Sequence, residues 1–132
     1  DGPSLIQAID ALRPPPRATE LPLRLCVADV YKCMKLGLAV GGKVEAGVVS
    51  VGDKVVLMPG SHPAVVKGIE VESRFRRVAH AGDNISLGLS GTEATMLGCG
   101  SVVCDPSHPV PVVDRAILQI LTFDIRVPMT LG

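Results

Sequence analysis

The chain has 132 residues, of which 47% are apolar and only 2% aromatic, and its 13 basic residues balance 13 acidic ones. This length and apolar content suit one domain with an aliphatic core. The balanced charge excludes a global electrostatic attraction to nucleic acid, and the scarcity of aromatic residues argues against a row of base-stacking platforms. Any contact with RNA would therefore be local.

A short helix is predicted near the start of the chain, in "PSLIQAIDALRPPPR". Ser4 can cap this helix, and apolar residues recur after it at helical spacing. Three consecutive prolines then end the helix, because proline lacks an N–H donor and blocks the preceding turn. One helix alone cannot bury its apolar stripe, and the chain starts at Asp1 instead of Met. We therefore expect residues 1–20 to be the tail of a preceding domain.

From Leu21 onward the apolar residues alternate with others, as is typical of β-strands. Six segments carry this pattern in turn: "LPLRLCVADVYK", "LAVGGKVEAGVV", "GDKVVLMP", "PAVVKGIEVES", "DNISLGLSG" and "GSVVCDP". Turn signals separate them about every ten residues, which predicts a β-barrel or a β-sandwich. Glycines at the turns permit the positive φ angles and tight bends that such a fold needs.

A proline-rich segment, "DPSHPVPVVD", follows the last of these strands and is typical of a joint between domains. Beyond it, "RAILQILTFDIRVP" alternates strongly. We expect residues 107–132 to be a linker and the first strand of a further domain. Such an apolar strand would be an association hazard if it stayed unpaired.

The sequence offers no motif that favours catalysis or metal binding. The "GGK" at residues 41–43 lacks the rest of a phosphate-binding loop, and a pair of barrel-closing glycines explains it. His80, Asp83 and Ser86 could suggest a catalytic triad, but no nucleophile-elbow motif surrounds the serine. Asp83 is instead expected to shape the turn "AGDN". The scattered histidines and the four cysteines lack zinc-ligand spacing, which predicts reduced thiols in a cytoplasmic protein.

Two small basic clusters could neutralise phosphates locally. They are Lys32, Lys35 and Gly37 in one predicted loop, and Arg74, Arg76 and Arg77 around Phe75 in another. Because glycine has no side chain, it lets an RNA backbone approach closely. The alternative interpretation is an ordinary solvated loop, which is what most charge clusters are. Glu70 and Asn84 lie where predicted strands meet turns, and by themselves they indicate little.

Four segments give the sequence a family resemblance: "PLRLCVADVYK", "GKVEAGVVSVGDKVVLMP", "VVKGIEV" and "AGDNISLGLSG". In order and spacing they resemble the second domain of the elongation factor Tu / elongation factor 1-alpha family of translational GTPases. The resemblance implies an all-β fold: a closed, roughly six-stranded antiparallel β-barrel over residues 21–106, preceded by a short helix and followed by an extra strand. The flanking pieces, residues 1–20 and 107–132, are similar to the end of the GTPase domain and the entrance of domain three.

For this part of the protein the resemblance implies binding without catalysis. GTP and Mg²⁺ would be bound and GTP hydrolysed in the absent GTPase domain, and the barrel would need no cofactor of its own. The implied partners are that GTPase domain, domain three and the RNA of the small ribosomal subunit, with no membrane. The RNA contact would involve Lys35, Gly37 and Leu38, where "KLGLAV" replaces the "GRGTV"-like loop of the family.

Within the family, "RLCVADVYK" and "KVEAG" are most similar to the ribosome-rescue GTPase that delivers Pelota, a protein mimic of tRNA. This similarity implies ribosome rescue and mRNA surveillance, with a Pelota-like protein held near Glu70, Arg74, Asn84 and Gly88. In elongation factors, the residues that match Glu70 and Asn84 hold the aminoacyl-adenosine end of tRNA. Gly88 stands in place of a bulky aliphatic residue, which reduces the apolar surface for adenine. An aminoacyl-tRNA carrier and a purely structural spacer between domains are the alternatives.

Overall fold

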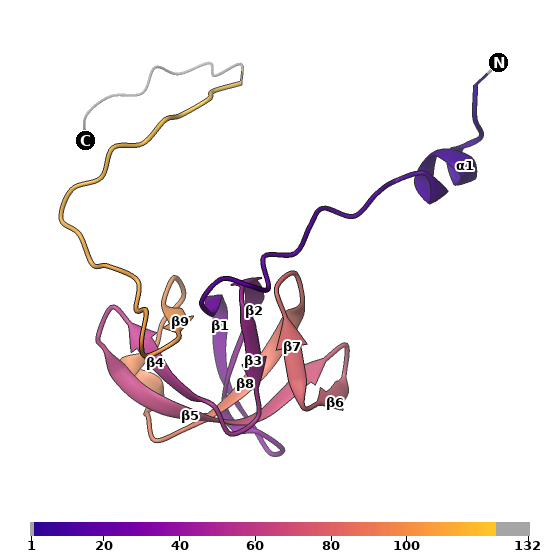
Figure 1. Ribbon diagram of the computed structural model, residues 1–132. Coiled ribbons are helices and arrows are strands. Elements are labelled where there is room, and N and C mark those ends of the chain that lie inside the picture. Colours follow the sequence, from indigo (N-terminus) through magenta and orange to yellow (C-terminus); the bar gives the residue numbers. More distant parts are fainter. Residues whose placement is uncertain (1, 124–132) are drawn as a thin grey trace.

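The computed structural model describes residues 2–123, in which one short helix precedes a β-barrel (Figure 1). The elements, in chain order, are α1 (Leu5–Asp10), β1 (Arg24–Cys33), β2 (Gly37–Ala46), β3 (Val48–Ser50), β4 (Lys54–Met58), β5 (His62–Val71), β6 (Arg74–Arg76), β7 (Val78–His80), β8 (Asn84–Ser90), a 3₁₀ turn (Ala94–Met96) and β9 (Val102–Cys104). In this part of the chain, no helix is long and apolar enough to cross a membrane.

Six of the strands form a closed antiparallel barrel, as the family resemblance implies. Their order is β4-β9-β1-β2-β8-β5, and β5 pairs back to β4 to close the sheet. Strand β6 extends one end of β5, while β3 and β7 form a small separate sheet. Each of the six predicted segments contains one barrel strand. Strand β3 was not distinguished from β2 in the sequence, and β6 and β7 were not predicted, because these three-residue strands lie within or directly beside longer segments and have no separate turn signals.

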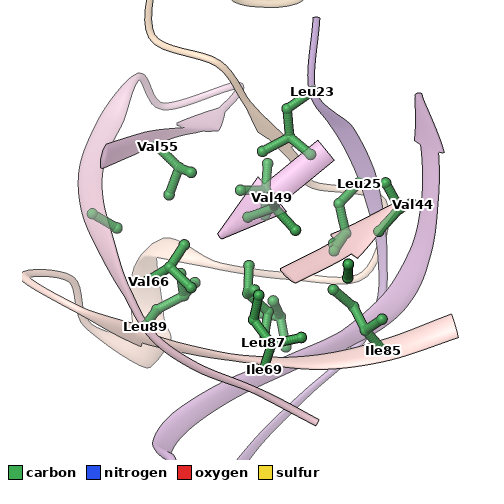
Figure 2. Close-up of a cluster of buried hydrophobic side chains, with 14 of the residues drawn as sticks. Leu23, Leu25, Val44, Val49, Val55, Val66, Ile69, Ile85, Leu87 and Leu89 are labelled. Carbon is green, nitrogen blue, oxygen red and sulfur yellow. The ribbon is translucent and has the colours of Figure 1, made fainter. Parts of the chain in front are cut away.

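Aliphatic side chains fill the interior of the barrel, and Figure 2 shows them pointing inward from the surrounding strands. The core cluster consists of Leu, Val, Ile and Ala residues, which confirms the expected aliphatic core. In β8, for example, Ile85, Leu87 and Leu89 are buried in this core. Their neighbours along the strand point outward, because successive side chains of a strand alternate between its faces. Functional side chains of the barrel strands are therefore found on the outer face.

The segment predicted as one strand, "LAVGGKVEAGVV", is divided into β2 and β3 at Gly47. This residue has a φ of +78°, a conformation that favours glycine. Its N–H donates a hydrogen bond of 2.8 Å to the carbonyl of Ala18. A Cβ atom at Gly47 would lie 2.7 Å from the carbonyl oxygen of Leu21 and from backbone atoms of Leu23. The close approach of the preceding linker thus requires glycine here.

The glycine pair in β2 lies where the barrel wall bends. Val27 pairs with Gly42 and Asp29 with Gly41, so that β1 has one extra residue in a β-bulge. A Cβ atom at Gly42 would collide with the carbonyl oxygen of Cys26. This close packing of two backbones agrees with the structural role expected for the pair.

The two ends of the chain differ in how they meet the barrel. Helix α1 is capped by Ser4, whose side chain accepts a hydrogen bond from the Gln7 N–H, but it buries no residue and lies away from the barrel (Figure 1). At the other end, residues 115–123 of the expected extra strand carry no strand assignment, and the remainder of that prediction lies outside the described residues. The division into domains at residues 20 and 106 stays a prediction.

The role of Gly47 can be tested by replacing it with alanine. We expect Gly47→Ala to lower the free energy of unfolding by about 1–3 kcal/mol, since a side chain at this φ is strained and would also collide with backbone atoms. Chemical denaturation followed by circular dichroism measures the change. Gly98→Ala is the matched control, because a Cβ atom at Gly98 meets nothing within 4 Å. Equal losses in the two variants would contradict the argument.

Candidate functional site

An open pocket of about 610 Å³ lies on the outer face of the barrel, where β1, β2, β8 and β5 run side by side. Its polar lining includes Lys43, Glu45, Glu70, Glu72, Asn84 and Ser86. The strand register explains the grouping, since Asn84 pairs with Lys43 and Ser86 pairs with Glu70. The structure thus brings together two of the predicted partner-binding residues, Glu70 and Asn84. The other two, Arg74 and Gly88, are not part of this lining.

The charge of the pocket is predominantly negative. Glu45, Glu70 and Glu72 contribute three carboxylates, against the single cation of Lys43. The Lys43 Nζ lies 3.5 Å from a carboxylate oxygen of Glu45, in an ion pair that is half exposed to solvent. Water screens this pair strongly, so it contributes little to stability. The remaining carboxylates repel a phosphate and attract hydrogen-bond donors and cations.

Tyr31 borders the pocket and was not singled out by the sequence analysis. Its hydroxyl donates a hydrogen bond of 2.5 Å to the Ser86 hydroxyl, which joins β1 to β8 across β2. The ring reaches across Gly41, where a Cβ atom would lie 3.6 Å from it. A lone aromatic residue near the end of a strand was the only sequence signal for this contact.

Gly88 lies beneath a side chain from another part of the chain. It pairs with Gly68 across β8 and β5, and both residues are buried. Leu36, in the turn between β1 and β2, is only 6% exposed and covers both glycines. A Cβ atom at Gly88 would lie 3.0 Å from the Leu36 Cβ, and one at Gly68 would lie 2.7 Å from the Leu36 Cδ2. Glycine inside a strand often marks such a close approach, which was the available signal for this contact.

The predicted RNA-contact residues lie at and beside the same turn. Lys35 is exposed, and its Nζ lies 5.6 Å from the centre of the Phe75 ring in a cation–π contact. Gly37 is exposed and has a φ of +73°. Leu38 is half-buried and lines a smaller hollow of about 300 Å³ together with Lys32. The fold therefore connects the lysine loop to Phe75, although the sequence analysis treated these regions as separate clusters.

The predicted arginine cluster is divided by the geometry of β6. Arg74 and Arg76 pair with inward-facing positions of β5, while Phe75 pairs with the outward-facing Glu70. Since neighbouring side chains of a strand point to opposite faces, the arginines and Phe75 occupy different sides of β6. All three are exposed. Arg74 thus lies apart from the pocket that contains Glu70.

Asp83 shapes its turn, as the sequence predicts. One carboxylate oxygen accepts a hydrogen bond of 2.9 Å from the backbone N–H of His80, and the other accepts one of 2.7 Å from Arg17. The backbone hydrogen bond from His80, and then the Arg17 guanidinium, lower the pKa of Asp83, while partial burial opposes the shift. Ser86 is bonded to Tyr31 instead. These hydrogen bonds give Asp83 a structural role and do not join the three residues as a triad.

The structure provides little for metal or redox chemistry. Within residues 2–123, no group of three or more His, Cys, Asp or Glu side chains could hold a metal ion. All four cysteines are free thiols, and three of them lie in strands.

Comparison with known proteins supplies the family context. The family model described as elongation factor Tu domain 2 matches residues 37–104. The protein HBS1 of Drosophila melanogaster is 33% identical over 131 residues, covering 99% of this chain and 20% of that protein. The elongation factor 1-alpha of Archaeoglobus fulgidus is 35% identical over 132 residues, covering 100% of this chain and 31% of that protein. The chain thus spans about a fifth to under a third of the length of these relatives.

Solved structures show the same fold. The structure of sup35 complexed with GMPPNP is similar with a TM-score of 0.67 and 28% identity, over 83% of this chain and 26% of that one. The elongation factor SelB from Methanococcus maripaludis, in complex with the GTP analogue GPPNHP, gives a TM-score of 0.70 at 21% identity, over 79% of this chain and 23% of that one. Because SelB shares only 21% sequence identity with this chain, the similarity to SelB establishes a common fold and nothing about function.

The lowered pKa of Asp83 predicts a contribution to stability that acid removes. Because the folded pKa lies below the ordinary value of 3.8, ionised Asp83 stabilises the fold above that pH, and the effect is lost as the pH falls through the folded pKa. We expect Asp83→Asn to lower the free energy of unfolding at about pH 7 and to differ progressively less from the wild type as the pH falls below the ordinary pKa of 3.8. Urea denaturation across this range measures both. Asp10→Asn, on the exposed helix α1, is the control, and a difference that does not change with pH would contradict the prediction.

Proposed function

Since this chain belongs to the elongation factor Tu domain 2 family, we propose that it is the partner-binding barrel of a translational GTPase that acts in ribosome rescue and mRNA surveillance. The whole protein would hydrolyse GTP with Mg²⁺ in a GTPase domain outside this chain. In the cytoplasm it would deliver a Pelota-like protein to stalled ribosomes. The barrel would position this protein and would perform no chemistry itself. The resemblance to HBS1 over nearly the whole chain supports this assignment.

The observation that carries the proposal is the acidic pocket around Glu70 and Asn84. A tRNA end brings phosphates, which the further carboxylates of Glu45 and Glu72, beside Glu70, disfavour. A protein segment with amide, hydroxyl or basic groups can donate hydrogen bonds to the same oxygens. The electrostatics of the pocket therefore support a protein as the delivered partner.

We assign the contact with ribosomal RNA to the turn between β1 and β2. Lys35 is exposed there and can pair with a phosphate. Gly37, also exposed, leaves room for a sugar–phosphate backbone to approach. Arg74 and Arg76 lie on a different side of β6 from Phe75, so their contribution would be to a partner that reaches around this strand.

The second candidate is the aminoacyl-tRNA-binding domain of an elongation factor 1-alpha-like carrier. Its support is the 35% identity to an archaeal elongation factor 1-alpha over the whole chain, together with the joint presence of Glu70 and Asn84 in the pocket. The two candidates predict different ligands for one site. A direct comparison of these ligands separates them.

The test uses the full-length protein loaded with a non-hydrolysable GTP analogue. It is titrated with aminoacyl-tRNA and, separately, with the Pelota-like protein of the same organism. We expect tight binding of the protein and negligible binding of the tRNA, because the pocket is acidic. Tight binding of the tRNA alone would reject the rescue assignment in favour of the carrier.

The RNA contact is tested by reversing the charge of Lys35. We expect Lys35→Glu to weaken binding of the full-length protein to the small ribosomal subunit and to reduce the slope of log K against log salt by about one, because one phosphate contact is lost. Lys54→Glu, the same charge change at the exposed start of β4, is the matched control. If Lys35→Glu leaves both affinity and salt slope unchanged, Lys35 does not contact RNA.

A further inference from the structure

Three neighbouring strands present a row of small residues on their outer face. Ala39 of β2 pairs with Gly88 of β8, which pairs in turn with Gly68 of β5. With so little side-chain volume, these residues leave a recess in the barrel wall. Leu36 occupies this recess, where its Cβ and Cδ2 atoms lie against Gly88 and Gly68. As a result, a leucine in an otherwise exposed turn is 94% buried, with only 6% of its surface exposed.

The recess adjoins the acidic pocket. The next outward pair on the same two strands is Ser86 and Glu70, and both line the pocket. Two residues along a strand correspond to about 7 Å, so the small residues and the polar groups lie within the span of one small ligand. Sites for small organic ligands combine an apolar surface with a few hydrogen-bonding groups. In this structure the pocket that holds the polar groups is open, and Leu36 fills the recess over the small residues beside it.

We propose that Leu36 is a specificity determinant that keeps nucleosides out of this site by occupying its apolar half. This inference rests on the proposed function and identifies a residue that would enforce it. A nucleobase has to bury a flat apolar ring as well as form hydrogen bonds. With Leu36 in place, the open pocket offers carboxylates, the Asn84 amide and the Ser86 hydroxyl beside small residues such as Ala28, and this mixture suits a protein segment. Gly88 and Gly68 contribute indirectly: because they have no side chains, Leu36 has room to pack against strands β8 and β5.

The turn itself holds Leu36 in position. The Leu36 N–H donates to the Cys33 sulfur at 3.3 Å, and the neighbouring Lys35 is placed over the Phe75 ring of β6. These contacts hold the part of the turn that leads into the leucine. Because β2, β8 and β5 pair through their own backbones, we expect these strands to stay paired when the Leu36 side chain is shortened.

The experiment measures two affinities in the full-length protein bound to a non-hydrolysable GTP analogue. Leu36→Ala should empty the recess and raise the affinity for aminoacyl-tRNA roughly tenfold or more, the usual effect of opening apolar space of this size to a ligand. Leu36→Met should refill the recess and restore the rejection of tRNA. Binding of the protein partner should persist in both variants, which also shows that they are folded. Met34→Ala is the matched control, since Met34 lies in the same turn and is fully exposed.

The outcomes separate this inference from the proposed function. If the wild type binds the protein partner and rejects tRNA, but Leu36→Ala also rejects tRNA, Leu36 does not determine specificity and the proposed function stands. If the wild type already binds aminoacyl-tRNA tightly, both fail. If Met34→Ala raises the tRNA affinity as much as Leu36→Ala does, loosening of the turn is the cause and the inference is overturned. Should Leu36→Ala fail to fold, Leu36→Val provides the same test with a smaller opening, and its tRNA affinity should lie between those of the wild type and a fully open recess.

Discussion

The pairing of β5 with β4 closes the sheet, and the rest of the structure depends on that closure. A closed sheet has an inside that aliphatic residues must fill, because a void in the core is costly. Leu25, Ile69 and Leu87 occupy this space from three different strands. Alternation then directs every second side chain to the outside. The molecule therefore has one surface on which recognition can occur, and the register of the strands decides which residues meet there.

Cross-strand rows on this surface organise the candidate site. One row is made of small residues and accepts Leu36, and the next contains Ser86 and Glu70 and forms part of the polar pocket. Both rows run across β8 and β5, so the turn that carries Lys35 and the pocket that contains Glu70 rest on the same two strands. A single stretch of barrel wall thus supports the residues proposed to meet RNA and those proposed to meet the delivered partner.

Charge separates these two roles. Although the chain as a whole has no net charge, the pocket is acidic while the turn beside it presents an exposed lysine. Opposite local charges close together can favour two different partners, a polyanion at the turn and a hydrogen-bond donor in the pocket. A module with this arrangement suits a factor that has to bring one partner to another. Because the chain has no net charge, its composition alone gave no indication of the proposed RNA contact.

The sequence by itself determined the six barrel strands, the aliphatic core, the cap at Ser4 and the turn at Asp83, because alternation, capping and turn chemistry act over a few neighbouring residues. The short strands β3 and β6 could not be distinguished in the sequence, because they directly follow the longer strands β2 and β5 and three residues give no separate alternation. Only the tertiary structure decided which outward residues became neighbours. The burial of Leu36 on Gly88, and the separation of Arg74 from Glu70, follow from the pairing of strands distant in sequence. That pairing depends on closure of the whole barrel. It cannot be predicted from the pattern of neighbouring residues in the sequence.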